Sequence, residues 1–571
     1  MPEDAPETID AKADVARRWG GRVPIVIGGI GHRDIHPADG KLAAAVRGEC
    51  RKLRTQYKSS PFVVLSALAE GADRLIAKTA MEELGADLVA VLPMPAADYE
   101  RDFLTEDSKA EFRAFLDHAV CVKTAALPAG PPWKADGEPR NEQYARAGAM
   151  IVDHAQILFA IWDGQPARGT GGTAQQVEWF FKGSSPEQYA LHKTTLSPLT
   201  PPESGLLIRI DPANAQVIAD EAGKPAGKNE IRSILKRTNT YNHDIARNPN
   251  AIAKSFPLLP AEEKIEALGL AEAVYNAADG VSIYFSNKVR NSETCIYYLA
   301  FGSILSLNFI NFRPVASWFF FAITIVMAAL AGRIQSLSVN NRYIEYRGLA
   351  EAMRTLYFWR AAGVSRWAWV SCLPRQMGAV HWIAQAVRSI EFCQGCNLPQ
   401  PPAGGVLTAK KHWVNGQKKW LFDKEVYHFN LFKRGNLISR WSISGSFVTA
   451  GILVLLTVIS DGHGVLLWED WVKPGHLGVL WQLLLGLFAI FELSGRDNRV
   501  HLELTKQCAS QRDVFENAYF QLDAIEKGAK SNWTETEVLE QLGRETLQAQ
   551  ADWLSRGHTE PFEQPIPGPV A

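Results

Sequence analysis

The sequence lacks a surplus of charge of either sign: 60 Lys and Arg residues stand against 61 Asp and Glu residues, for a formal net charge of -1. Bulk charge therefore indicates no strongly acidic or basic partner. Cysteine is scarce and odd in number, at 7 in 571 residues, which does not fit the disulfide framework of a small secreted protein. The first twenty or so residues contain no apolar core of the kind that a signal peptide needs, so we expect the first domain to stay in the cytosol.

The chain also lacks a convincing zinc motif. Cys393 and Cys396 form a single C-x-x-C, and no second pair follows at the spacing of a structural zinc site. We therefore expect no metal. A length of 571 residues exceeds one ordinary domain, and about two to four domains are expected.

From Pro24 to about Gly183, short apolar runs alternate with helical patterns. Nearly continuous apolar runs are typical of buried parallel strands, and helical patterns between them are typical of crossover connections. We therefore predict an α/β Rossmann-like domain built on a parallel sheet. Its strands are expected at residues 24–30, 61–68, 87–94, 119–124 and 156–164.

Glycine and polar residues follow several of these strands. Ligands of such sheets bind at the carboxyl ends of the strands. Glycine lets a backbone approach a phosphate, a helix N-terminus presents free N–H groups, and arginine adds charge-assisted hydrogen bonds. We therefore predict a nucleotide site made by Gly28, Gly29, Gly31, His32, Arg33, Ser66, Glu70, Gly71, Asp73, Arg74, Pro93, Tyr99, Asp163, Gly171, Gly172 and Thr173.

The second half of the chain carries four apolar segments, at residues 296–312, 315–332, 443–460 and 476–493. Each approaches the roughly 17–25 residues that cross a bilayer. Buried core helices are the alternative, particularly for the first segment. The close pairing of the segments favours an all-α membrane domain with four transmembrane helices in two hairpins. Basic residues flank the hairpins, so we expect a multi-pass inner-membrane protein with cytoplasmic N- and C-termini.

The expected membrane hairpins suggest a conducting assembly. Ser303, Ser306, Asn308 and Asn311 lie close to one side of the first segment and are candidate pore-lining residues, although packing between helices is the alternative. Four spans are too few to enclose a wide path, so a homo-oligomer is expected, with a tetramer favoured. The section between the hairpins is basic and could hold anionic lipids or nucleic acid, or could be a solvated face.

The expected organisation has eight parts. They are a flexible N-terminus (1–21), the Rossmann-like domain (22–183), an insertion or linker that completes it (184–265), a coupling helix (266–295), the first hairpin (296–332), a basic cytoplasmic helical section (333–442), the second hairpin (443–493) and cytoplasmic C-terminal helices (494–571).

A similar arrangement follows each hairpin. "NNRYIEYRGLAEAMRTLYFW" and "DNRVHLELTKQCASQRDVFENAYFQ" both begin close to Asn-Arg and continue as long amphipathic patterns, which suggests an internal repeat. In the first copy, "YRGLAEAMR" (residues 346–354) matches the Y-R-x-x-A-E-x-x-R pattern that follows a membrane hairpin in the SLATT family, which this part of the chain resembles. That resemblance implies a pore-forming or membrane-disrupting effector of a prokaryotic conflict system.

The front domain resembles the SLOG family, which includes the LOG and DprA proteins and the front domain of TRPM channels. The resemblance rests on "GIGHRD", "LSALAEGADRLIA", "VLPMPAADYERDF" and "LFAIWDG" followed by "GTGGTA". It implies nucleotide binding, with the first glycine turn as a phosphate turn and Arg33 on the anion. LOG enzymes cleave an N-glycosidic bond with an Arg and a Glu. The Glu position is Gln176 here, so binding without turnover is expected, and Glu70 is the possible substitute acid or base.

Together the two resemblances imply a nucleotide-controlled membrane effector of anti-phage defence, similar in layout to Hailong-type systems. The implied ligand is a second messenger, a cyclic oligonucleotide or a short DNA oligomer, made by a partner nucleotidyltransferase, and it either activates or inhibits the effector. Inner-membrane lipids are the other implied partner. No resident cofactor is expected. The alternative is a membrane-anchored SLOG-type nucleotide hydrolase.

Overall fold

The computed structural model describes residues 15–35, 40–128, 130, 134, 137–167, 169–190, 205–222, 230–309, 318–319, 321–327, 329, 339–371, 381–394, 401–462 and 474–559. The chain divides into two compact units. The first, called the sheet unit below, comprises Met1–Val281, Glu345–Ala409 and Leu539–Ser555. The second, called the helical unit, comprises Ser282–Ile344, Lys410–Val538 and Arg556–Ala571.

The sheet unit is built on a seven-stranded sheet of order β4-β3-β2-β1-β5-β6-β7. The strands are β1 (Ile25–Gly31), β2 (Phe62–Ser66), β3 (Asp87–Leu92), β4 (Cys121–Thr124), β5 (Ile157–Ile161), β6 (Gly205–Ile210) and β7 (Val217–Ala222). The first six are parallel, and β7 runs antiparallel to β6. The chain fills one half of the sheet outward from β1 and then returns to place β5 on the other side of β1. The strand order therefore reverses between β1 and β5, where α/β sheets bind their ligands.

Strands β1 to β5 lie where the apolar runs predicted them, and the Rossmann-like parallel sheet is present. The central strands are buried on both faces because helices cover both. A Cβ on Gly28 would meet Ile151 of one helical layer, whereas a Cβ on Gly29 would meet Ile76 of the other. These neighbouring residues point in opposite directions, as the two-residue period of a strand requires.

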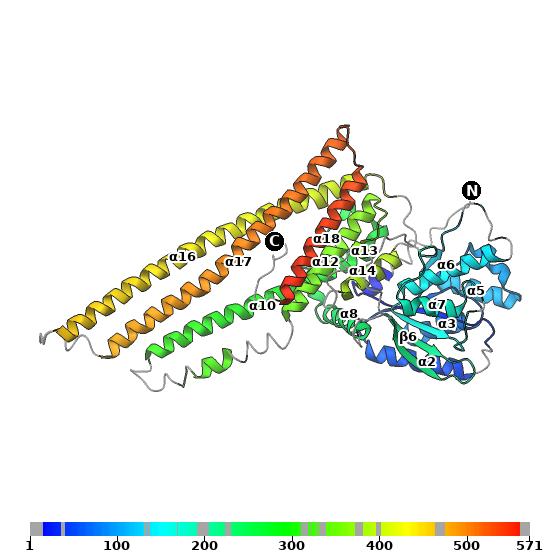
Figure 1. Cartoon of the computed structure of the whole chain (residues 1–571), viewed down its shortest axis with the longest axis horizontal. Coiled ribbons are helices and arrows are strands. Elements are labelled where there is room, and N and C mark those ends of the chain that lie inside the picture. Colours follow the sequence, from blue (N-terminus) through cyan, green and yellow to red (C-terminus); the bar gives the residue numbers. More distant parts are fainter. Residues whose placement is uncertain are drawn as a thin grey trace. The chain divides into compact units, whose positions relative to one another are not determined.

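Helices surround the sheet in two layers (Figure 1). Helices α2, α3 and α5 contribute residues such as Val46, Ile76 and Phe112 to one core, while α6 and α14 lie against the other face, where Gln156 bonds Gln385 at 3.1 Å. The helices of the front part are α2 (Gly40–Gln56), α3 (Ala72–Leu84), α4 (Ala96–Tyr99), η1 (Glu100–Asp102), α5 (Glu106–His118), α6 (Glu138–His154), α7 (Thr173–Lys182), α8 (Glu230–Arg247), α9 (Pro249–Ile252), η3 (Ala261–Glu263) and η4 (Glu266–Leu268).

Two parts of the front domain are more ordered than the sequence suggested. The expected linker at 184–265 contains β6, β7 and α8, because "GLLIRI" is a further continuous apolar run that extends the parallel sheet. The end of the expected flexible N-terminus is helical at residues 15–19, and Trp19 is buried with its indole N–H 2.8 Å from a carboxylate oxygen of Asp87.

The remaining helices include the longest of the described chain. They are α10 (Gly269–Phe309), α12 (Val339–Ala362), α13 (Ala368–Ser371), α14 (His381–Gln394), α15 (Gly405–Thr408), the π-helical η6 (Ala409–Val414), α16 (Asn415–Gly462), α17 (Pro474–Glu526) and α18 (Glu535–Thr559). In the helical unit, α16 and α17 lie side by side (Figure 1). Lys410 of η6, just before α16, bonds Asp523 at 3.0 Å, while His428 further along α16 lies 3.2 Å from His501, so the two helices run antiparallel.

The prediction of four transmembrane helices is wrong for this structure. Among the described residues, no helix combines the length and apolarity needed to cross a membrane. The third segment also contains polar side chains: Ser446 and Thr449 each donate a hydrogen bond to a carbonyl one turn earlier. The multi-pass inner-membrane localisation, the membrane-effector and ion-channel assignments and the lipid contacts that depended on these spans lose their basis.

The candidate pore-lining residues depended on the expected hairpins, and the structure describes none of their side chains. Ser303, Ser306 and Asn308 belong to α10, whose backbone is described at these positions although their side chains are not. Asn311 lies outside the described residues, as do much of the second segment and the connection between the third and fourth.

Candidate functional site

A cavity of about 420 Å³ opens at the carboxyl ends of β1 and β5, where the strand order reverses. The residues that follow β1 and β5 form two of its sides, and α6 forms a third. Its lining includes ten of the predicted site residues: Gly31, His32, Arg33, Asp73, Pro93, Tyr99, Asp163, Gly171, Gly172 and Thr173. The other six, Gly28, Gly29, Ser66, Glu70, Gly71 and Arg74, are not part of the lining.

The glycines of the first turn serve packing between β1 and α3. A Cβ on Gly31 would lie 2.4 Å from the Cβ of Ala72, and a Cβ on Gly71 would lie 2.4 Å from the Arg33 carbonyl oxygen. Gly71 also has a φ of 81°, in the left-handed region that glycine adopts most readily. These glycines therefore let the start of α3 approach the end of β1. The turn reaches the cavity mainly through the side chains of His32 and Arg33.

Asp73 is the most deeply buried acid in the cavity wall, with 6% of its surface exposed. It lies in the first turn of α3, and backbone hydrogen bonds from Ala69 and Gly31 reach its carboxyl group. Burial raises the pKa of Asp73 to about 7, against the opposing effects of Arg33 and of those two hydrogen bonds. A raised pKa means that the protonated acid is favoured in the low-dielectric wall of the cavity.

Arg33 is held at the cavity by an aromatic ring. Its guanidinium carbon lies 5.1 Å from the ring centroid of Tyr144, and the residue is solvent-exposed. The Tyr144 hydroxyl donates a hydrogen bond to Asp102, and Arg140 pairs with the same carboxylate at 2.5 Å. Asp102 is therefore occupied by Arg140 and Tyr144, and Arg33 presents a positive charge to the cavity.

His32 and Asp163 lie on opposite sides of the switch point and contact each other. The His32 Nε2 atom is 3.3 Å from a carboxylate oxygen of Asp163 and 3.4 Å from its backbone nitrogen. A single ring nitrogen either donates to the carboxylate or accepts from the N–H, so the proton on His32 decides which contact is made. Asp163 also accepts a hydrogen bond from the Gln165 N–H at 3.0 Å, which fixes the loop after β5.

The N-terminus of α7 faces the cavity through Thr173 and Ala174. Two glutamines fix the turn before it: the Gly171 N–H donates to Gln175 at 2.7 Å, and Gln176 donates its side-chain N–H to the Gly171 carbonyl at 2.8 Å. The first amides of a helix have no intrahelical partner and attract anions. The Gly171 N–H is already satisfied, so the amides of Thr173 and Ala174 are the better anion donors.

Arg74, predicted as an anion ligand, has a structural role. Its guanidinium donates to the Leu68 carbonyl at 3.0 Å, pairs with Glu111 at 2.8 Å and lies over the ring of Phe103. Leu68 has a φ of 58°, which is unusual for a branched side chain, and Arg74 helps to fix that turn.

Ser66 and Glu70 also stabilise this region away from the cavity. The Ser66 hydroxyl accepts from the Leu68 N–H at 3.0 Å, and the Ser108 hydroxyl donates to Glu70. Glu70 is therefore a poor substitute for a catalytic acid in the cavity.

Sequence reasoning missed the wall that α6 contributes. Asn141, Tyr144, Gly148 and Ile151 line the cavity from one face of this helix, and Trp162 lines it from the loop after β5. The signal was present: residues 141, 144, 148 and 151 recur at helical spacing just before the last predicted strand. The rule for parallel sheets points to the residues that follow strands, whereas α6 is a crossover helix that precedes β5.

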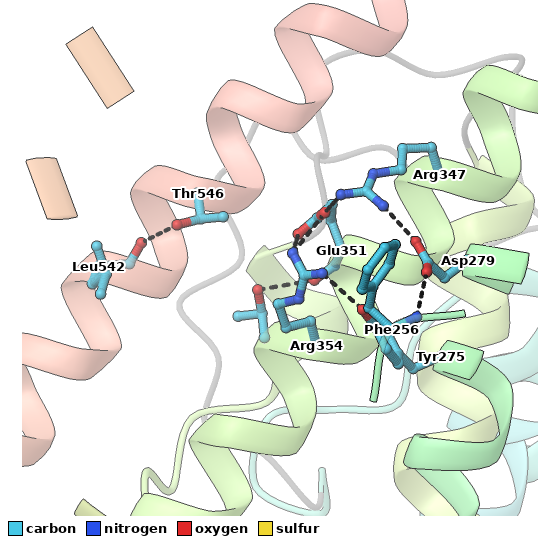
Figure 2. Close-up of polar contacts among 9 residues, drawn as sticks. Phe256, Tyr275, Asp279, Arg347, Glu351, Arg354, Leu542 and Thr546 are labelled. Carbon is cyan, nitrogen blue, oxygen red and sulfur yellow. Dashed lines mark hydrogen bonds and ion pairs between the residues drawn. The ribbon is translucent and has the colours of Figure 1, made fainter. Parts of the chain in front are cut away.

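The residues that carry the SLATT resemblance form a second polar cluster in the sheet unit, shown in Figure 2. Arg347 bridges Asp279 and Glu351, and Arg354 bonds Glu351 at 2.6 Å and the Tyr275 hydroxyl at 2.8 Å. We call these five residues the ion network. The side chains of its charged members are between 0% and 11% exposed.

The ion network joins α10 to α12 inside the sheet unit. Neighbouring motif positions join further helices: the Tyr346 hydroxyl donates to Asp244 of α8 at 2.6 Å, and Glu345 accepts from Trp382 of α14 at 2.7 Å. The charged face of α12 is therefore buried and paired within the protein, so a solvated face, one of the alternatives for this section, does not describe α12. Five of the basic residues of this section, Arg347, Arg354, Arg360, Arg366 and Lys410, form ion pairs within the protein.

Within the described part of the chain, no group of three or more His, Cys, Asp or Glu side chains is placed to hold a metal ion. Comparison of the sequence and the structure with protein-family models, curated proteins and solved structures gives no match.

Proposed function

We propose that this chain is a nucleotide sensor that binds a nucleotide-derived ligand in the cavity between β1 and β5 without turning it over. The observation that carries the proposal is the position of the cavity, at the switch point of a Rossmann-like sheet and against a helix N-terminus. Its volume of about 420 Å³ falls within the range of small-molecule sites and suits one nucleotide unit. A longer oligonucleotide would extend out of the cavity.

Each part of a nucleotide has a suitable neighbour in the cavity. The amides of Thr173 and Ala174 and the guanidinium of Arg33 suit a phosphate. The Trp162 ring offers an apolar surface for a base. The carboxylate of Asp163, which lies at the cavity wall, suits a sugar hydroxyl or an exocyclic amine.

The state of Gln176 supports binding without turnover. In the pattern of the LOG enzymes that the front domain resembles, this position carries the catalytic Glu. Here the side chain is an amide that is used to hold the Gly171 carbonyl. A carboxamide does not ionise near neutral pH, so it serves as neither a general acid nor a general base.

The SLOG and SLATT resemblances favour a role in prokaryotic anti-phage defence. In that role the ligand is made by a partner nucleotidyltransferase, the signal is a cyclic oligonucleotide or short DNA oligomer, and the sensor works as a homo-oligomer, with a tetramer favoured. The helical unit would then carry the response.

The test measures nucleotide binding by calorimetry, after mass spectrometry has identified nucleotides that co-purify with the chain. Arg33→Ala should weaken binding by about 10- to 100-fold, the scale of a lost hydrogen bond to a charged group. Arg101→Ala is the matched control, because Arg101 is exposed and does not line the cavity. The bound nucleotide should be recovered unchanged after incubation. Equal affinity in the wild type and Arg33→Ala, or steady hydrolysis, would contradict the proposal.

A further inference from the structure

We propose that Asp73 binds the ligand as a neutral acid that donates its O–H to a ligand oxygen, so that the cavity takes up a proton together with an anion. This inference rests on the proposed function, because it concerns the same cavity. It gives Asp73 a role in selecting the ligand, because a neutral acid favours ligands that accept a hydrogen bond at this point, and an ionised carboxylate cannot donate one.

The first observation is the position of the carboxyl group. Asp73 lines the cavity although only 6% of its surface is exposed, so a ligand that fills the cavity would remove its remaining water. Backbone N–H groups of Ala69 and Gly31 already bond to the carboxyl group. An ionised carboxylate could offer a ligand only acceptor sites, whereas the acid also offers one donor.

The second observation is that Asp73 and the expected phosphate share one cation. The charged and titratable groups that face Asp73 are Arg33 from the turn after β1, Arg74 from its own helix and Tyr99 from α4. Arg74 is committed to Leu68, Ser108 and Glu111. Burial raises the pKa of the Tyr99 hydroxyl, so this residue stays neutral. Arg33 is therefore the cation that both anions would use.

The binding of a phosphate to Arg33 removes the attraction that favours the ionised form of Asp73. Two negative groups would then share one positive group in a buried site, and like charges in such a site disfavour ionisation of one of them. Burial already raises the pKa of Asp73 to about 7 in the free protein. The Asp73 carboxylate is the group that can accept a proton when the ligand binds. The complex therefore holds one proton more than the separate partners.

The experiment is calorimetry of ADP binding to the full chain at about pH 8, in two buffers with different enthalpies of protonation, which counts the protons taken up. At this pH the ADP phosphates are ionised, so the proton goes to the protein. We expect an uptake of about half to one proton, and an affinity that falls by up to about tenfold for each pH unit above neutrality.

Two variants identify the group. Asp73→Asn keeps a donor and an acceptor but cannot titrate, so the uptake and the pH slope should both disappear. His32→Gln tests the nearby histidine; its affinity for ADP should fall, but the proton uptake should persist. Should Asp73→Asn fail to fold, as judged by circular dichroism, the wild type and His32→Gln still decide the question, because an uptake lost with His32 would overturn the proposal.

The outcomes separate the two proposals. ADP binding without proton uptake, or with uptake that is unchanged in Asp73→Asn, overturns the role of Asp73 and leaves nucleotide binding in place. A wild-type chain that binds neither ADP nor inorganic phosphate overturns both.

Discussion

The cavity and the ion network both bury a carboxyl group, and they treat its charge in opposite ways. Burial raises the pKa of Glu351, but the attraction of Arg354 and Arg347 outweighs this effect and leaves the pKa below its usual value. Burial raises the pKa of Asp73 to about 7, and the attraction of Arg33 does not restore the usual value. The two acids differ in their neighbouring cations: two arginines pair directly with Glu351, whereas Arg33, near Asp73, also faces the cavity.

The difference indicates what each region is built for. In the ion network, the two arginines, Glu351 and Asp279 satisfy one another within the protein. A buried network with matched charges holds α10 and α12 in one arrangement and needs no ligand. In the cavity, Arg33 is exposed and is shared by a buried acid and the open space. A site whose charges are not fully paired within the protein can pair the remaining charge with a ligand.

The largest expected effect comes from a matched pair of amide substitutions. Glu351→Gln removes the charge that two buried arginines share, and breaking a buried ion pair costs about 3–5 kcal/mol of unfolding free energy. Asp73→Asn should instead increase the free energy of unfolding above neutral pH, because it removes a carboxyl group whose ionisation is disfavoured in the native state. We expect a gain of up to about 4 kcal/mol there, since the pKa shift from 3.8 to about 7 spans about three units and each unit corresponds to about 1.4 kcal/mol.

The pH dependence gives the sign of each effect. The native state holds the Asp73 proton more tightly than the unfolded chain, so its contribution to stability is present at low pH and is lost as the pH rises from about 4 to about 7. Glu351 contributes above its usual pKa and loses that contribution as the pH falls. Urea unfolding across this pH range measures both. Lys182→Met, at an exposed ion pair, should change little. Equal changes in the free energy of unfolding of Glu351→Gln and Asp73→Asn would contradict the contrast between the ion network and the cavity.

A smaller effect is expected from the two glutamines that hold Gly171. Gln175 accepts a hydrogen bond from the glycine N–H, so Gln175→Glu keeps an acceptor in place. Gln176 donates to the glycine carbonyl, so Gln176→Glu places a carboxylate against an oxygen. The second substitution should cost about 1–3 kcal/mol of stability, the penalty for an unsatisfied buried group, and the first much less.

Gln176 lines the cavity, but its side chain is held by the Gly171 carbonyl. We therefore expect that Gln176→Glu does not acquire nucleotide hydrolysis, because a carboxylate alone at this position does not supply the rest of a catalytic arrangement. Thermal unfolding and chromatography of incubated nucleotides measure the two properties. A stable and hydrolytic Gln176→Glu variant would contradict our description of this turn.

The sequence predicted the parts of the fold that depend on continuous local patterns. Strands β1, β2, β3 and β5 are nearly continuous apolar runs, and the rule that ligands bind after strands led to His32, Arg33 and Asp163. It could not separate Arg33 from Arg74, since both follow a glycine-rich turn. Only the packing of α3 shows that Arg74 turns inward against Phe103.

Features that depend on distant partners were harder to predict. The wall of α6 reaches the cavity only because the chain crosses from β4 to β5, and the ion network pairs residues about seventy positions apart. The membrane prediction was wrong for this structure, because no helix among the described residues is both long and apolar enough to cross a membrane. The length of an apolar run can be read from the local sequence, whereas the environment of a long helix depends on residues that are distant in the chain.

The most direct test of nucleotide binding in the cavity is photolabelling of the full chain with 8-azido-ADP, followed by peptide mapping. Our account predicts adducts on the peptides that contain Tyr144 or Trp162, which line the cavity, and predicts that unlabelled ADP abolishes them. Arg33→Ala should reduce the same adducts at equal probe concentration. Adducts that map elsewhere, or that unlabelled ADP does not reduce, would contradict it.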